Sequence, residues 1–150
     1  MSSPRTLYSR LGGRPTLERV HGLLYDELFG HAWLGRFFEG LERTYLEEQQ
    51  TDFLGAAMGG PKCYAGQYPR PAHRHMLISD ELFDLRHELL ERCIARAGVP
   101  AELASEWLRL DEGYRSAVVK HSIDECEQRY VFEDLVVIED PRTGSDRLAG

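Results

Sequence analysis

One stretch, residues 58–78, constrains the fold more than any other part of the chain. It reads MGGPKCYAGQYPRPAHRHMLI and holds three Gly and three Pro in 21 residues. Because Pro interrupts helix interiors and Gly destabilises them, these residues cannot form one continuous helix. Helical patterns precede and follow the stretch, and a loop of this length inside a compact domain is usually functional. We therefore expect a long loop that positions a functional side chain, and His73 is the candidate.

Composition is typical of a soluble globular protein with a single domain. The 150 residues are 42% hydrophobic and 29% charged, and no apolar run approaches the ~20 residues of a membrane span. The N-terminus, MSSPRTLYSR, lacks the apolar segment of a signal peptide, which predicts a cytoplasmic location. A net charge of −7 argues against nucleic acid or an anionic membrane as partner. We expect one domain over residues 1–150, with a core of about 7–121 and an extension of uncertain structure at 122–150.

Helical periodicity predicts an all-α fold. Expected elements are a short turn at 7–11, a helix from Thr16 to Gly30 and an aromatic-rich segment at 32–38. Thr44 and Glu47 form a capping-box pattern that predicts Thr44 as the N-cap of the next helix. Later helices are expected to begin at Ser79, to stop at 98–100, and to run from about Ala101 to His121.

Two stretches do not follow the simple helical pattern. The helix after Thr44 presents Leu46, Gln50, Phe53 and Ala57 on its inward face. An unpaired buried amide costs roughly 1–3 kcal/mol, so Gln50 predicts a polar partner inside the fold. Residues 130–138, YVFEDLVVI, are apolar and β-branched without helical periodicity. They fit a frayed continuation of the last helix, an extended surface tail or a dimer contact.

The ordered set of turn, histidine and the distal residues Tyr25, Leu46 and Gln50 resembles the truncated, or 2-over-2, haemoglobins. In that family a Gly-Gly-Pro-x-x-Tyr turn ends the distal helix, and a histidine five residues before an Ile binds haem iron. Here the turn spans residues 59–64, and His73 stands five residues before Ile78. The resemblance covers roughly residues 7–100. It implies a globin-like sandwich of two antiparallel helix pairs around haem.

The resemblance makes His73 the expected iron ligand. A solvent-exposed loop histidine is the alternative for an arbitrary protein. His75 is the nearest rival, and His73-x-His75 as a zinc pair lacks further ligands at useful spacing. The three cysteines are odd in number and widely spaced, and Cys-x-x-Cys-His is missing. We therefore expect haem b, bound non-covalently.

On the distal side the resemblance places Tyr25 and Gln50. Leu46 matches the position where many globins carry a distal histidine, and it cannot donate a hydrogen bond. This combination is closest to group I of the family. Tyr25 would be the main donor to bound O2, with Gln50 bonding the ligand or the tyrosine hydroxyl. The alternative for Tyr25 is a helix-flank residue with its hydroxyl in water.

The resemblance also predicts residues around the haem. Each of these side chains is equally well explained as ordinary core or as a solvated surface group. At one position the chain departs from the family: Arg86 stands where relatives carry Val or Trp. A buried unpaired Arg is very costly, so Arg86 must reach a propionate or an acid, or the helix is rotated. The expected lining is Phe38, Leu46, Phe53, Leu54, Leu77, Ile78 and Phe83, and the propionate partners are Lys62, Tyr64, Arg70 and Arg74.

The expected function is that of a haem-binding globin for O2, NO and CO, in storage, transport or sensing. NO dioxygenation is a second role, which would need a separate electron donor because the chain has no flavin motif. A haem-free, globin-like helical interaction module is the alternative. A peroxidase is disfavoured because it normally needs a distal acid-base histidine, and Leu46 stands there. Monomer and homodimer are both open.

Overall fold

A computed structural model of the chain describes residues 5–142. Over that range the regular secondary structure is helical, and the one isolated bridge between extended segments joins Met76 and Val136. The all-α prediction is confirmed for this part of the chain. None of the helices in it is long and apolar enough to cross a membrane.

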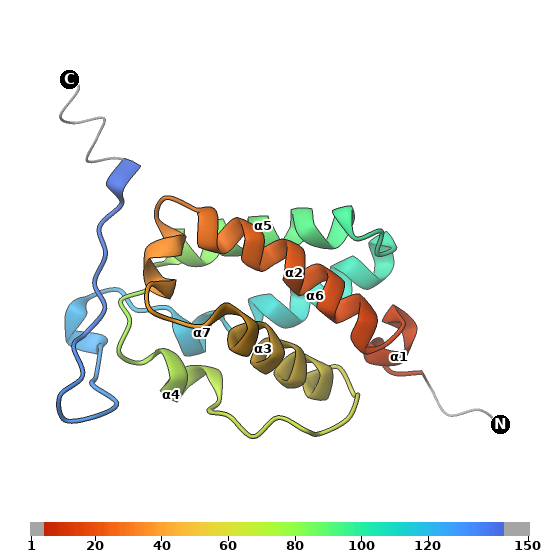
Figure 1. Cartoon of the computed structure of the whole chain (residues 1–150), viewed down its shortest axis with the longest axis horizontal. Coiled ribbons are helices and arrows are strands. Elements are labelled where there is room, and N and C mark those ends of the chain that lie inside the picture. The colour runs from red at the N-terminus through yellow and green to blue at the C-terminus, as the bar shows by residue number, and fades with distance from the viewer. Residues whose placement is uncertain (1–4, 143–150) are drawn as a thin grey trace.

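Two pairs of helices form the body of the fold (Figure 1). α2 (Arg14–Gly30) packs on α3 (Arg43–Ala57), and α5 (Asp80–Arg96) packs on α6 (Ala101–Glu112). The two helices of each pair run in opposite directions, and α2 also packs on α5. The shorter elements are α1 (Leu7–Leu11), η1 (Leu34–Phe38), α4 (Pro69–His73), α7 (Arg115–Val118) and η2 (Ile123–Glu125).

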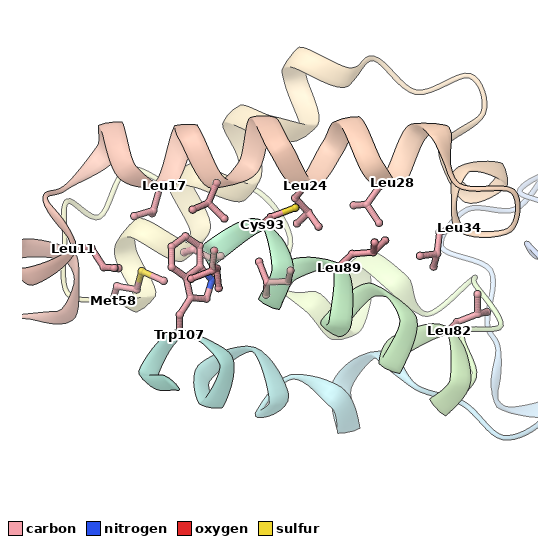
Figure 2. Close-up of a cluster of buried hydrophobic side chains, with 14 of the residues drawn as sticks. Leu11, Leu17, Leu24, Leu28, Leu34, Met58, Leu82, Leu89, Cys93 and Trp107 are labelled. Atoms are coloured by element: carbon pink, nitrogen blue, oxygen red, sulfur yellow. The ribbon is translucent and has the colours of Figure 1, made fainter. Parts of the chain in front are cut away.

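The core lies mainly between α2 and α5, with α6 below them (Figure 2). Leu17 and Val20 of α2 are completely buried, because their helical spacing puts them on one face. Ile94 of α5 and Trp107 of α6 are also fully buried against that face. Burying each such side chain stabilises the fold by about 1.5–3 kcal/mol. This packing fixes α2 and α5, and therefore the elements that they carry.

The predicted Thr44 cap is wrong. α3 begins at Arg43, and its N-cap is Glu42, whose carboxylate accepts hydrogen bonds from the backbone N–H groups of Thr44 and Tyr45. A carboxylate has two acceptor oxygens, so it satisfies two of the free N–H groups at the helix start. The Ser79 cap is confirmed, since its hydroxyl oxygen accepts from the N–H of Leu82.

The last long helix is shorter than predicted. It ends at Glu112, and the N–H of Gly113 bonds the carbonyls of Arg109 and Leu110 at 3.2 and 3.1 Å. Gly is a poor helix former, and the chain turns here before α7. His121 therefore lies outside a helix, with its side chain 74% exposed.

The Gly/Pro stretch is a long loop, as predicted, except for the single turn of α4. That turn carries His73 at its last position. Residues 130–138 adopt the extended surface conformation, since Val136 pairs in parallel with Met76. The helical continuation is therefore wrong, and a dimer contact stays a prediction. Residues 143–150 of the expected extension lie outside the described range.

Candidate functional site

His73 is held by its own short helix. Its Nδ1 lies 2.7 Å from the carbonyl oxygen of Pro69, four residues earlier. In the neutral ring this nitrogen is the N–H donor, because a carbonyl oxygen can only accept. Nε2 then carries the lone pair, and no partner for it is found among residues 5–142. The ring is oriented as a metal-binding histidine requires.

The charge state of His73 fits the same use. Burial lowers its pKa to about 4, and the positive charges of Lys120 and Arg86 act in the same direction. The hydrogen bond to Pro69 opposes this shift without cancelling it. His73 is therefore neutral at physiological pH, as a ligating imidazole must be.

His75, the rival ligand, lies in a different environment. It is only 4% exposed, and its Nε2 lies 3.9 Å from a carboxylate oxygen of Glu133 in the C-terminal tail. Within the described chain no group of three or more His, Cys, Asp or Glu side chains could hold a metal ion. In the described part of the chain, His73 and His75 therefore have no third protein ligand with which they could form a zinc site.

Tyr25 points into the interior from α2. It is 7% exposed, and its ring centroid lies 6.0 Å from those of Phe29 and Phe38. Burial raises the pKa of its hydroxyl to about 12, although the charge of Arg86 opposes the shift. No hydrogen-bond partner of this hydroxyl is found in the described part of the chain. Tyr25 is therefore a buried O–H donor without a protein partner in the described part of the chain.

The face of α3 differs in part from the prediction. Leu46, Gln50 and Phe53 are half-buried, whereas Ala57 is exposed. The most deeply buried face carries Thr51, whose hydroxyl oxygen lies 2.7 Å from Nδ1 of the buried His21. This polar contact joins α2 and α3. The amide of Gln50 has no hydrogen-bond partner among residues 5–142.

The expected aromatic lining is divided among three groups. Phe38 stacks on Phe29 with centroids 5.1 Å apart, beside Tyr25. Phe53 lies 5.2 and 5.4 Å from the rings of Tyr64 and Tyr114.

Phe83 forms the third group. It is 3% exposed, with the guanidinium of Arg115 4.4 Å from its ring centroid. The aliphatic residues differ in burial: Leu54 belongs to the main core, whereas Leu77 and Ile78 are half-buried.

The four expected propionate partners differ in whether they already make hydrogen bonds within the protein. Lys62 and Arg70 are exposed, and no hydrogen bond or ion pair of either is found in the described chain. The Tyr64 hydroxyl donates to the carbonyl of Gln67. Arg74 donates to the carbonyl of Gln128 at 3.0 Å, so it binds the C-terminal tail.

Arg86 reaches an acid, which resolves its unusual position. Its guanidinium lies 2.7 and 2.6 Å from the two carboxylate oxygens of Asp111 in α6. His87 Nδ1 lies 2.7 Å from the same carboxylate. Burial raises the pKa of Asp111, but Arg86 and His87 outweigh it, and the net shift is downward. Sequence reasoning missed Asp111, although its position four residues after Trp107 on the apolar face of α6 was a signal.

Comparisons with known proteins agree with this arrangement. The family model described as bacterial-like globin matches residues 6–119. A group 1 truncated haemoglobin of Tetrahymena pyriformis is 30% identical over 115 residues, which are 77% of this chain and 95% of the relative. A group 1 truncated haemoglobin of Mycolicibacterium paratuberculosis is 34% identical over 107 residues, covering 71% of this chain and 79% of the relative.

Solved structures show the same fold. The crystal structure of the Tetrahymena pyriformis truncated haemoglobin in its Fe(III) form superposes with a TM-score of 0.73 and 27% identity, covering 78% of this chain and all of that one. A 2/2 haemoglobin from Synechococcus, crystallised with covalently attached haem, gives a TM-score of 0.71 at 24% identity over 77% of this chain and 98% of that one. The second likeness concerns the fold alone.

Proposed function

This chain belongs to the bacterial-like globin family as a haem-binding truncated haemoglobin, and from that premise we propose that it binds O2 reversibly, with His73 as the iron ligand. The observation that carries the proposal is the hydrogen bond from His73 Nδ1 to the Pro69 carbonyl. It fixes the tautomer in which Nε2 is the free lone-pair donor. The geometry of His73 therefore fits its proposed role as the axial ligand of haem iron.

Haem iron with one axial histidine supplies the reversible binding of O2 and of other diatomic ligands. The side chains on the opposite, distal side of the haem would set the polarity around the bound ligand. The buried Tyr25 hydroxyl, with its pKa raised to about 12, stays protonated across the physiological range and can donate a hydrogen bond to O2. Gln50, one turn beyond Leu46 on α3, offers a second donor with no internal partner in the described chain. Leu46 adds apolar cover without a donor.

Aromatic side chains are proposed to shield this site from water. Phe38 and Phe29 flank Tyr25, and Phe53 packs with Tyr64 near the start of the long loop. We assign Lys62 and Arg70 as the groups that meet the haem propionates, because both are exposed and neither is engaged by another described side chain. Arg74 is withdrawn from that role, because it donates to the tail.

NO oxidation is a second proposed activity. It requires O2 that is held firmly until NO arrives, and the protonated Tyr25 hydroxyl favours that state. Regeneration of ferrous iron would come from a separate electron-donor protein. The attachment of haem is proposed to be non-covalent, because the chain has no Cys-x-x-Cys-His motif.

Reconstitution tests the proposal. The purified chain is titrated with ferric protoporphyrin IX, reduced under nitrogen, exposed to O2 and flushed again. We expect a Soret band that saturates at one haem per chain, an O2 spectrum that reverses on flushing, and haem that is fully extracted by acidified acetone. A chain that stays colourless would contradict the proposal and favour a haem-free helical interaction module.

A further inference from the structure

The C-terminal strap, defined here as residues 120–138, follows directly after the part of the chain matched by the family model, which ends at residue 119. In Figure 1 it runs beside the segment that follows α4. It contacts that segment through backbone and side-chain hydrogen bonds. These contacts begin at the carbonyl of His73 itself.

Lys120 supplies the first of them. Its ammonium donates to the carbonyls of His73, Met76 and Val118 at 2.6, 2.8 and 2.9 Å. An ammonium has three donors, so all three are used. The residue is 8% exposed, which shields these charged hydrogen bonds from water. Lys120 therefore binds the carbonyl end of α4, where the His73 carbonyl also accepts from the N–H of Met76 at 2.9 Å.

The strap backbone continues the same pattern. The N–H of Glu127 donates to the Arg74 carbonyl at 2.8 Å, and the N–H of Val136 donates to the His75 carbonyl at 2.8 Å. The N–H of Leu77 donates to the Val136 carbonyl at 2.9 Å. Four consecutive carbonyls, those of residues 73–76, thus accept hydrogen bonds from the strap.

Both ends of the strap are tied to the protein. At its beginning the N–H of Lys120 donates to the Ile78 carbonyl at 2.8 Å. At its far end the indole N–H of Trp33 donates to the Ile138 carbonyl at 2.9 Å, and Trp33 is 6% exposed. Between them Arg129 and Glu133 form an ion pair at 2.6 Å with side chains 26% and 15% exposed. Hydrogen bonds therefore hold the strap to the rest of the protein at both of its ends.

A restraint here bears on the His73 ring. α4 has five residues, and a helix this short is not stable by itself in water. The hydrogen bond from His73 to Pro69 lies within that helix, so it orients the ring only relative to α4. What fixes α4 relative to the rest of the fold is its packing on α7 and the strap.

We propose that the C-terminal strap positions the proximal histidine, with Lys120 and Val136 as positioning residues that set how the His73 imidazole meets the haem iron. This inference rests on the proposed function. Without these contacts α4 would no longer be held in place, so His73 would hold haem iron less firmly and haem would be lost faster.

Two variant pairs test it in the full chain reconstituted with haem. Lys120→Met removes the ammonium. Arg19→Met is its control, because Arg19 also donates to a carbonyl at the end of a helix, that of Ala97 at 3.1 Å, but this helix is α5 and not α4. Val136→Pro removes one N–H from the strap, and Val137→Pro is its control, because the N–H of Val137 makes no hydrogen bond within residues 5–142. The second pair keeps the test valid if Lys120→Met does not fold.

The readouts are the iron–histidine stretching band of the ferrous protein by resonance Raman spectroscopy and the rate of haem transfer to an apomyoglobin acceptor. We expect Lys120→Met and Val136→Pro to shift the band and to speed haem loss about 10-fold, the effect of losing one charged or buried hydrogen bond. Both controls should match the wild type. Bands and rates unchanged in both strap variants would overturn this inference alone. A wild type without an iron–histidine band would overturn the proposed function with it.

Discussion

Asp111 accepts two hydrogen bonds from Arg86, at 2.7 and 2.6 Å, and this partly buried pair joins α5 to α6. Burial raises the pKa of Tyr25 and lowers that of His73, and the charge of Arg86 opposes the first shift and adds to the second. The guanidinium therefore lies within electrostatic range of the proposed distal donor and of the proposed iron ligand. Asp111 keeps this cation paired and fixes its place between α5 and α6.

Removing the acid should destabilise the fold. Asp111→Asn leaves Arg86 with a neutral partner in a site where the aspartate side chain is only 7% exposed. Breaking a buried pair from one side typically costs about 3 kcal/mol. Urea unfolding should show this loss, whereas Asp80→Asn, whose side chain is 52% exposed in its pair with Arg115, should change stability by less than about 1 kcal/mol. Equal losses in the two variants would refute the assignment.

Tyr25→Phe should speed O2 release. A hydrogen bond to a partly charged ligand contributes roughly 1.5–3 kcal/mol, which corresponds to an increase of about 10- to 150-fold in the dissociation rate. Stopped-flow displacement of O2 by CO measures that rate. Tyr45→Phe is the control, since Tyr45 is 58% exposed on α3. An unchanged rate in Tyr25→Phe would remove Tyr25 from the distal site.

Acid should destabilise the protein through His21. Burial lowers the pKa of His21 to about 3, from 6.5 for a free histidine. As the pH falls from 6.5 toward 3, the unfolded chain binds a proton that the folded chain does not. The free energy of unfolding should therefore fall by about 1.4 kcal/mol per pH unit over that window, and it should be independent of His21 above it.

The matched variant for this slope is His21→Asn, which keeps a polar group beside Thr51 but cannot titrate. Urea unfolding of both proteins at several pH values between 7 and 4 gives the comparison. The variant should show a shallower decline by that amount. Parallel declines would mean that His21 is not the titrating group.

The Gly-Gly-Pro turn should tolerate no side chain at Gly60. A Cβ there would lie 2.6 Å from the Tyr8 ring of α1, a clash with a rigid group. Gly60→Ala should cost about 1–3 kcal/mol in thermal or chemical unfolding. Gly22→Ala provides the contrast, since nothing lies within 4 Å of its added Cβ, and helix propensity predicts a gain of about 0.5–1 kcal/mol. A neutral Gly60→Ala would show that α1 does not need this close approach.

The sequence predicted the features that depend on local signals. Apolar spacing in α2 and the Ser79 cap of α5 could be predicted, because each depends on residues within one or two turns. The Gly/Pro content of residues 58–78 predicted the loop that carries His73. The family resemblance then assigned roles that periodicity alone could not.

One missed feature is a local choice between two candidate caps, and the others depend on contacts between distant residues. Glu42 replaced Thr44 as a cap because a carboxylate can satisfy two N–H groups, which the Thr44–Glu47 pattern did not reveal. The pairing of Val136 with Met76 joins segments sixty residues apart, and no local pattern specifies it. The Arg86–Asp111 pair was likewise beyond local reasoning, although the high cost of an unpaired Arg required some partner.

The most direct test of the account is whether His73 alone holds the iron. His73→Gly should lose the wild-type ferrous and CO spectra and regain them when imidazole is added, because free imidazole can occupy the space of the missing side chain. His75→Gln should keep both spectra without imidazole. If His73→Gly retains the wild-type spectra without imidazole, or if His75→Gln is the variant that loses them, the central claim is contradicted.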